Sequence, residues 1–301
     1  MQQVSVCHVD AHLRQQPANV PTSPHDQLEI GLIVVNYNSA QATTQLLVDL
    51  LQQDRSSFAL TVVVADNGPS SSGLVSLRQA YRDNPSVRFE EMTANLGYFG
   101  AAHSALETVW KGRPPDWTIV SNPDIRLQQP GFFSRIAHGM AGNGAVIAPR
   151  IVSTRTGLDQ NPFLRGRPSV LRMNLNRLIP RVPLLFWLMQ TQCAVKRAIR
   201  SRLRGKLAQP ATASSNIYAP HGAFIIFSKE YFRRGGSLSA GAFLFAEEIF
   251  VAETCRRLGL GVVYSPTLEV LHDEHVSTKT NPAVRRYLAE ATDYCARKFF
   301  S

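Results

Sequence analysis

The feature that most constrains the fold of this chain is a series of short apolar runs, each ending in polar residues. Such continuous runs are typical of parallel strands that are buried on both faces of a sheet. Segments with helical spacing separate them, which predicts βα units and an α/β fold with a doubly wound, mostly parallel sheet flanked by helices. We expect Ser39 to be the N-cap of the first helix. The predicted strands cover 30–38, 59–68, 86–92, 117–120 and 144–151. The predicted helices cover 39–53, 72–84 and 131–140, and 95–112 is predicted as a loop that enters a helix.

Polar residues cluster just beyond the predicted strands of the first half of the chain. In a doubly wound sheet, ligands bind outside the carboxyl ends of the strands. We therefore expect these clusters to gather along one edge of the sheet and to form a binding site there. The residues are Asn36, Asn38, Asp66, Asn67, Asn95, Gly97, Asn122 and Asp124.

The second half of the chain is less regular. Helical and strand-like patterns return at 218–236, 243–260, 261–266 and 268–278, and 281–300 is predicted to form a closing helix. The chain is therefore divided into a flexible polar tail at 1–27, a first half at 28–150, a second half at 151–278 and a C-terminal helix at 279–301. The second half includes a basic helical insert at 165–209, where Pro183 suits a first helical turn. Apolar residues recur there at helical spacing at Leu184, Leu188, Val195, Ile199 and Leu203.

The charge of the chain is unevenly distributed. The formal net charge is +10, and no acidic residue lies between Asp159 and Glu230, whereas 165–206 is rich in arginine and lysine. Such a block predicts binding to a polyanion: phospholipid head groups, nucleic acid or a phosphorylated substrate. A solvated helical surface without a partner is the alternative interpretation.

The composition, 44% hydrophobic and 18% charged over 301 residues, is that of a globular protein with one large core or two joined halves. The cysteines show no CxxC spacing, so we expect reduced thiols and no disulfide framework or zinc site. The longest apolar run, 183–189, is far shorter than the roughly 18 residues of a membrane span. No secretory leader is recognisable at the start. We therefore expect a cytoplasmic protein. The cysteines are Cys7, Cys193, Cys255 and Cys295.

A carboxylate follows the apolar strand 117–120 in the turn Asn122-Pro123-Asp124. A carboxylate at a ligand-binding edge suits a hard divalent cation such as Mg²⁺ or Mn²⁺, which would neutralise the phosphates of a nucleotide. The alternative is an Asx turn, in which Asp124 binds only backbone amides.

Two adjacent acids, Glu247 and Glu248, stand at a predicted helix start among apolar residues. Acids there complement the helix dipole, which is a structural explanation. In apolar surroundings one of them can instead have a raised pKa and act as a general base. After the later strand, His272 or His275 is a candidate metal ligand or phosphate contact, although a structural histidine is the alternative.

Taken together and in order, these stretches resemble family 2 glycosyltransferases of the bacterial, rhamnosyltransferase-like kind. The resemblance covers roughly 30–278. It implies a GT-A fold, a nucleotide-sugar-binding half at 28–150 and an acceptor-binding, catalytic half at 151–278. The matching stretches are VVNYNS, VVVADNGPSSSG, NLGYFGAAHSAL, SNPDI, HGAFIIFSKEYF, FLFAEEIFVAETCRRLGLGVVYSP and VLHDEHVST.

The resemblance also assigns roles to residues of the donor site. Asp124 would hold Mg²⁺ or Mn²⁺ against the diphosphate of the donor, and Asn122 stands where the fuller metal motif has its first acid. His272 would be a metal or diphosphate contact. Asp66 and Asn67 would contact the nucleoside, and the remaining residues of the same pocket would be Asn36, Asn38, Asn95 and Gly97.

For catalysis, the resemblance implies an inverting transfer in which Glu248 takes the proton of the acceptor hydroxyl, although Glu247 could exchange roles with it. The donor would be dTDP-rhamnose or a UDP-hexose. The acceptor would be a glycan or a lipid-diphosphate-linked glycan in cell-surface polysaccharide synthesis, with the basic segment resting on the inner face of the cell membrane. The competing interpretations are a nucleic-acid-binding protein and a non-catalytic nucleotide-sugar-binding subunit.

Overall fold

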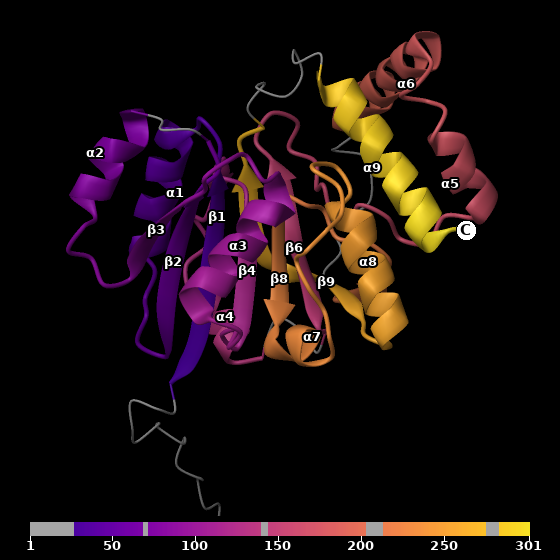
Figure 1. The fold of residues 1–301 in the computed structure, drawn as a ribbon. Coiled ribbons are helices and arrows are strands. Elements are labelled where there is room, and N and C mark those ends of the chain that lie inside the picture. Colours follow the sequence, from indigo (N-terminus) through magenta and orange to yellow (C-terminus); the bar gives the residue numbers. More distant parts are fainter. Residues whose placement is uncertain (1–26, 69–71, 140–143, 203–212, 275–282) are drawn as a thin grey trace, which may run out of the picture.

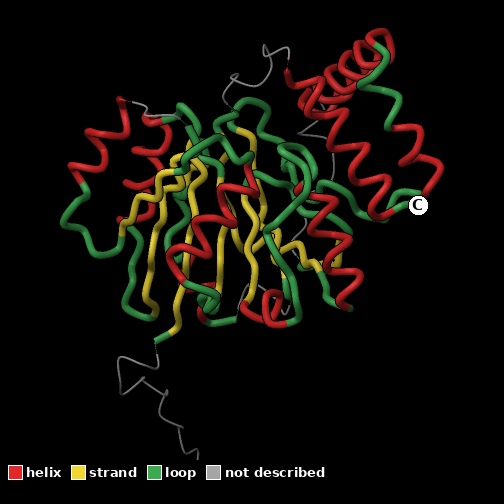
Figure 2. Tube along the Cα trace, in the orientation of Figure 1, coloured by secondary structure: helices red, strands yellow, loops and turns green. Residues whose placement is uncertain are grey.

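A computed structural model describes residues 27–68, 72–139, 144–202, 213–274 and 283–301 (Figures 1 and 2). Three predicted parts lie outside the described residues. They are the flexible tail up to residue 26, His275, and the end of the basic insert from residue 203 onward. The elements are, in chain order, β1 (Leu28–Asn36), α1 (Ala40–Leu51), β2 (Phe58–Asp66), α2 (Ser72–Ala80), β3 (Val87–Glu91), α3 (Tyr98–Trp110), β4 (Trp117–Ser121), β5 (Ile125–Arg126), α4 (Phe132–Ala137), β6 (Val146–Ser153), α5 (Val170–Asn176), α6 (Pro183–Arg202), β7 (Ser215–Ile217), β8 (Phe224–Ser228), α7 (Lys229–Arg233), α8 (Glu247–Leu258), β9 (Val262–His272) and α9 (Ala283–Phe299).

One central sheet organises the described part of the chain. Its strand order is β3-β2-β1-β4-β8-β6-β9-β5, and β7 pairs with β9 outside that path. The strands β3, β2, β1 and β4 are parallel, and so are β6 and β9. Antiparallel pairing occurs where β8 joins β4 to β6 and where β5 and β7 join β9. The predicted mostly parallel α/β sheet is therefore confirmed.

The strands are buried on both faces, as their continuous apolar sequences predict. Successive side chains of a strand point to opposite faces, so Ile33 and Val35 lie in one core, which includes α3, α8 and α9 residues. Leu32 and Val34 lie in the other core, with residues of α1, α2 and α4. Helices therefore cover both faces of the sheet.

The register of the strands brings their polar ends to the same edge. Asn36 at the end of β1 lies opposite Asp66 at the end of β2. Ser121, which ends β4, lies opposite Val34 of β1. The polar residues that follow these strands therefore emerge beside one another, as expected for parallel strands of similar length.

The start of α1 differs from the prediction in its hydrogen bonds. Ser39 stands at the N-cap position, but its hydroxyl does not cap the helix and donates to the Tyr37 carbonyl instead. The Asn36 amide oxygen accepts the Ser39 N–H at 3.2 Å and the Thr43 hydroxyl at 2.9 Å, which joins the end of β1 to the first turns of α1. A strand-terminal asparagine can do this because the strand turns directly into the helix.

Two boundaries in the structure differ from the sequence pattern. The helix predicted at 72–84 ends at Ala80, four residues before the next turn residue Asn84. The two stretches given separately at 261–266 and 268–278 contribute to one strand, β9. Its register against β6 shifts between Pro149 and Arg150, so the irregularity lies within a continuous pairing. A bulge of this kind interrupts the side-chain alternation that the sequence pattern relies on.

The basic insert contains α5 and α6, which stand beside α9 at one side of the molecule (Figure 1). α6 begins at Pro183, as predicted. Part of the positive charge is neutralised internally, because Arg177 and Arg181 both bind the Asp293 carboxylate of α9. Within the part of the chain that the structure describes, no helix is long and apolar enough to cross a membrane.

Candidate active site

The edge of the sheet at β1 and β2 carries a buried carboxylate, Asp66. It accepts a hydrogen bond from the Asn36 amide at 3.3 Å and forms an ion pair with Arg78 at 3.3 Å. Burial raises the pKa of Asp66, while the Asn36 hydrogen bond and the Arg78 charge lower it in part. Asn36 itself is fully buried. Its contacts orient Asp66 and join the end of β1 to the start of α1.

A second set of amide hydrogen bonds joins this edge to the start of α3. The Asn67 side chain donates to the Asn95 side chain at 2.9 Å and to the Gly97 carbonyl at 3.1 Å, and accepts from the Leu96 N–H at 2.8 Å. Three of the sequence-predicted residues are thus brought together. Asn38 is exposed nearby, with a positive φ of 51°.

Gly97 allows the start of α3 to lie directly against the segment that precedes α8. Its φ is 76°, and a Cβ there would lie 2.1 Å from the Phe243 carbonyl oxygen. That carbonyl accepts the Tyr98 N–H at 3.2 Å. Any side chain at Gly97 would separate the two segments, so glycine is required here for packing.

Asp124 and His272 are neighbours across two short paired segments. Asp124 immediately precedes β5, and β5 pairs with the end of β9 so that Ile125 lies opposite His272. The Asp273 N–H donates to the Asp124 carbonyl at 2.9 Å, which extends the pairing. As a result the Asp124 Oδ1 and His272 Nε2 atoms are 3.3 Å apart.

This pair fits two ligands of one divalent cation. Neighbouring ligands of an octahedral cation with bonds of about 2.1 Å lie about 3.0 Å apart, close to the observed separation. The described residues contain no group of three or more acidic, histidine or cysteine side chains that could hold a metal ion. A cation here would therefore take further oxygen ligands from phosphate and water, as Mg²⁺ commonly does.

The acids Glu247 and Glu248 form the first turn of α8. Glu247 is 6% exposed, whereas Glu248 is partly exposed and accepts the Gly222 N–H at 3.2 Å. Burial raises the pKa of Glu247, and the Glu248 charge raises it further. Burial also raises the pKa of Glu248, but backbone N–H groups, including that of Gly222, favour its ionised form. The pair therefore holds one protonated acid beside a more readily ionised one.

The segment 221–223, just before β8, connects the two groups of residues. Its Gly222 N–H binds Glu248, and its Ala223 carbonyl accepts the Asn122 N–H at 2.8 Å. The His221 ring lies 6.0 Å from the His272 ring. Asp124, His272 and Glu248 therefore lie around one segment, on the same side of the molecule.

His221 was not predicted as a site residue. Burial lowers the pKa of His221 to about 4, and the neighbouring His272 lowers it as well. The ring is therefore neutral at physiological pH, and its Nδ1 atom accepts the Ala223 N–H at 3.2 Å. Its place in the stretch HGAFIIF was the available signal, but that stretch gave no chemical reason to select it.

Tyr98 was also missed. It starts α3, and its hydroxyl is buried without a hydrogen-bond partner among the described residues. Burial raises the pKa of Tyr98 well above its usual value, and the charges of Glu247, Asp124 and Glu248 raise it further. These three carboxylates therefore lie close enough to act electrostatically on the Tyr98 hydroxyl.

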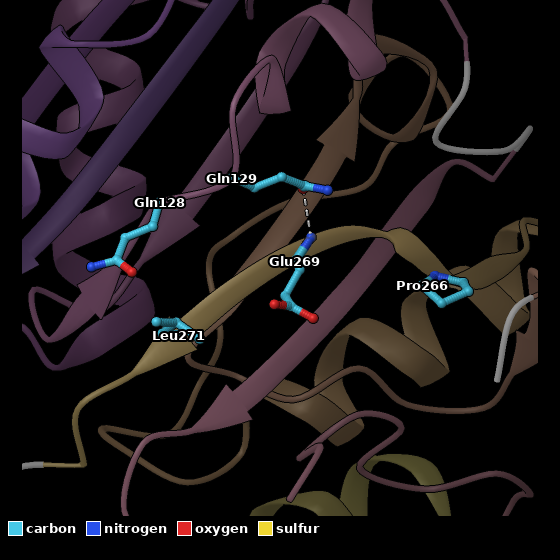
Figure 3. A pocket seen from close by; sticks show the side chains of 5 residues that line it. All are labelled: Gln128, Gln129, Pro266, Glu269 and Leu271. Atoms are coloured by element: carbon cyan, nitrogen blue, oxygen red, sulfur yellow. Dashed lines mark hydrogen bonds between the residues drawn. The ribbon is translucent and has the colours of Figure 1, made fainter. Parts of the chain in front are cut away.

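A separate hollow, the pocket of Figure 3, is lined by none of these residues. Its wall includes Glu269 and Leu271 of β9. Leu271 and His272 are consecutive in β9 and point to opposite faces. The hollow is therefore separate from the candidate site.

No protein-family model matches the chain. The chain is 24% identical over 264 residues to an N-acetylglucosaminyl-diphospho-decaprenol L-rhamnosyltransferase of Mycobacterium tuberculosis. The matched region covers 84% of this chain and 79% of that protein.

Solved structures with similar folds are glycosyltransferases. GalNAc-T7, crystallised with UDP, GalNAc and Mn²⁺, is 12% identical with a TM-score of 0.57; the match covers 83% of this chain but only 44% of GalNAc-T7. The mannosyltransferase PcManGT of Pyrobaculum calidifontis, in complex with GDP-Man and Mn²⁺, is 15% identical with a TM-score of 0.50, covering 94% of this chain and 68% of that one. The predicted GT-A fold and the predicted resemblance to glycosyltransferases are confirmed. The relative and both solved structures are glycosyltransferases, in agreement with the prediction that this protein is one.

Proposed function

We propose that this protein is an inverting glycosyltransferase that uses a nucleotide-sugar donor and a divalent cation. The observation that carries the proposal is the arrangement around 221–223, where the two candidate cation ligands and the acid pair lie against the same short segment. Asp124 and His272 form the first pair, 3.3 Å apart. Glu248, fixed by Gly222, belongs to the second.

The nucleoside of the donor would bind at the edge formed by Asp66 and Asn67, where buried amide and carboxylate contacts already fix the geometry. Asp124 and His272 would hold Mg²⁺ or Mn²⁺ beside the diphosphate. When bound, such a cation supplies positive charge that stabilises the departing diphosphate. Asn122 adds no charge to this pair, so the diphosphate itself would be an important part of the cation site.

Glu248 is the proposed general base. Its carboxylate takes the proton of the acceptor hydroxyl while that oxygen forms a bond to the anomeric carbon and the bond from that carbon to the diphosphate oxygen breaks. Attack from the face opposite the diphosphate inverts the anomeric configuration. The neighbouring Glu247, kept protonated by burial, would leave Glu248 as the single carboxylate that accepts the proton.

Tyr98 is proposed to donate a hydrogen bond to the bound donor. A buried hydroxyl without a partner costs free energy that a ligand oxygen can recover. Because Asp124 and the acid pair act electrostatically on this hydroxyl, it would lie near the transferred sugar in this mechanism.

A lipid-diphosphate-linked acceptor would explain the surface of α5 and α6. The relative from M. tuberculosis has such a lipid-linked substrate in its name. Exposed basic residues, among them Arg172 and Lys196, lie near a series of exposed apolar side chains. We propose that this surface rests on an anionic membrane, the apolar residues entering the interface and the basic ones facing the head groups. The apolar residues are Leu171, Leu175, Leu184, Trp187, Leu188, Val195 and Ile199.

The proposed activity is tested by a thermal-shift screen of nucleotide-sugars with and without Mn²⁺. A ligand that binds only the native state at 100 times its dissociation constant adds about 2.7 kcal/mol to stability. We expect dTDP-rhamnose or a UDP-hexose to raise the melting temperature, and Mn²⁺ to increase that shift. A melting temperature unchanged by every nucleotide-sugar, with or without Mn²⁺, would contradict the proposal.

The membrane surface is tested by flotation with anionic liposomes. Leu184 and Val75 are both 64% exposed, but Val75 lies on α2 in the first half of the chain. Leu184→Glu is expected to reduce flotation, and Val75→Glu should leave it unchanged. The membrane proposal would be contradicted if both variants floated as well as the unmodified protein. It would also be contradicted if the protein bound random oligonucleotides but not liposomes.

A further inference from the structure

Gln160 connects the proposed metal ligand His272 to a carboxylate behind it. The Gln160 Oε1 atom lies 2.7 Å from His272 Nδ1. Its amide nitrogen donates to Glu274 Oε1 at 2.9 Å. Glu274 in turn forms an ion pair with Arg155. These contacts form a single chain that ends at the ring facing Asp124.

The chain of contacts determines which nitrogen of His272 carries hydrogen. The Glu274 carboxylate forms an ion pair with the Arg155 guanidinium, which can only donate hydrogen bonds, and its Oε1 atom lies 2.9 Å from the Gln160 amide nitrogen. An ionised carboxylate only accepts hydrogen bonds, so the amide nitrogen of Gln160 must face Glu274. The amide oxygen then faces His272, and Nδ1 must be the hydrogen donor.

The consequence lies at the other side of the ring. With hydrogen on Nδ1, a neutral His272 has its lone pair on Nε2, the atom that lies 3.3 Å from Asp124 Oδ1. A lone pair directed at this position is what a cation shared with Asp124 requires. Histidine ligands of metals are generally fixed in this way by a hydrogen bond to the other ring nitrogen.

We propose that Gln160 is a positioning residue that fixes the tautomer and ring orientation of His272 for a divalent cation; this rests on the proposed function for the identity of the cation site. Gln160 does not touch the reacting atoms. It acts through His272, and Glu274 fixes its amide in the required orientation.

The backbone around Gln160 is held independently of its side chain. The Gln160 N–H donates to the Ile151 carbonyl at 2.8 Å, and Asp159 accepts the N–H groups of Ile151 and Asn161. The Tyr264 hydroxyl also donates to Asp159 at 2.6 Å. Removal of the Gln160 amide should therefore leave this segment in place, so its effect on the metal site can be separated from folding.

The test compares Gln160→Leu with Gln129→Leu. The control amide also bridges two groups, because Gln129 donates to the Thr267 carbonyl at 2.9 Å and accepts the Glu269 N–H at 2.8 Å. It does so beside the separate hollow of Figure 3. Both substitutions remove a glutamine amide that contacts β9, but only the Gln160 amide contacts His272.

The first measurement is Mn²⁺ affinity in the presence of UDP. It is determined from the electron paramagnetic resonance signal of free Mn²⁺. Loss of a group that orients a metal ligand typically weakens binding about 10–100-fold, and we expect this for Gln160→Leu. Gln129→Leu should bind as the unmodified protein does. Equal affinity in all three proteins would overturn the proposal.

The second measurement needs no metal. Long-range ¹H–¹⁵N correlation spectra report which ring nitrogen carries hydrogen, and His272→Gln identifies the His272 signal. We expect hydrogen on Nδ1 in the unmodified protein and a mixture of tautomers in Gln160→Leu. Hydrogen on Nε2 in the unmodified protein would refute the assignment. If Mn²⁺ binds none of the proteins while the tautomer is as expected, the proposed function fails and the tautomer assignment stands.

Discussion

Gly222 provides a sensitive test of the general base, because it controls the position of the Glu248 carboxylate. A Cβ at position 222 would lie 2.9 Å from Glu248 Oε1 and 3.4 Å from its Cδ. The φ angle of Gly222 is not in the positive range, so alanine is compatible with the backbone. Gly222→Ala therefore changes the position of the carboxylate without straining the chain.

The size of the effect follows from these distances. To reach ordinary contact with the new methyl group, the carboxylate must retreat by about 0.5 Å. The hydrogen bond from the Gly222 N–H, now 3.2 Å long, would then exceed the usual limit. A hydrogen bond to a charged group contributes about 1.5–3 kcal/mol, so we expect kcat to fall about 10–150-fold.

The assay is sugar transfer measured across pH, with donor affinity measured separately by calorimetry. Because the Gly222 N–H favours the ionised carboxylate, its loss raises the pKa of Glu248, and the variant should recover part of its activity as pH rises. Donor affinity should not change, since Asp66 and Asp124 are untouched. Gly261→Ala is the matched control, because a Cβ there meets nothing within 4 Å. Unchanged kcat in Gly222→Ala, or an equal loss in Gly261→Ala, would refute the reasoning.

Three further variants test neighbouring groups. Asp124→Asn should abolish the increase in donor affinity that Mn²⁺ produces, measured by calorimetry; a retained increase would place the cation elsewhere. Because the folded-state pKa of Glu247 is raised above its usual 4.5, its contribution to stability is present below that pH and is lost as pH rises. Glu247→Gln should therefore become more stable than the unmodified protein as pH rises in urea unfolding, and a pH-independent difference would contradict this. Tyr98→Phe removes a hydroxyl without a partner, so the melting temperature should stay equal or rise while donor affinity falls about 2–12-fold; a lower melting temperature would indicate a structural role.

The longer strands of the sheet were predictable because each carries its own apolar signal, whereas β5 and β7 are too short to carry one. Continuous apolar runs require burial on both faces, and parallel strands of similar length bring their polar ends together. Asp66 and Asn67 reached the expected edge for this reason. The same reasoning could not show that Asn36 is fully buried, because its contacts with Ser39 and Thr43 depend on how the chain turns into α1.

The rest of the site depends on pairs that are distant in sequence. Gln160 and His272 are 112 residues apart, and Gly222 lies 26 residues from Glu248. No local pattern marks such residues, since a lone glutamine or glycine in an irregular segment has many possible roles. Tyr98 was hidden differently: its stretch was noticed for its glycines, and only the fold shows that its hydroxyl lacks a partner.

The central claim is that Glu248 removes the acceptor proton in a site that binds the donor through other residues. It is tested most directly by Glu248→Gln, with sugar transfer and donor binding measured on the same preparation in the presence of Mn²⁺. General-base catalysis contributes about 10²–10⁴-fold, so we expect transfer to fall by that factor while the donor binds with unchanged affinity. Transfer at close to the unmodified rate would contradict the account.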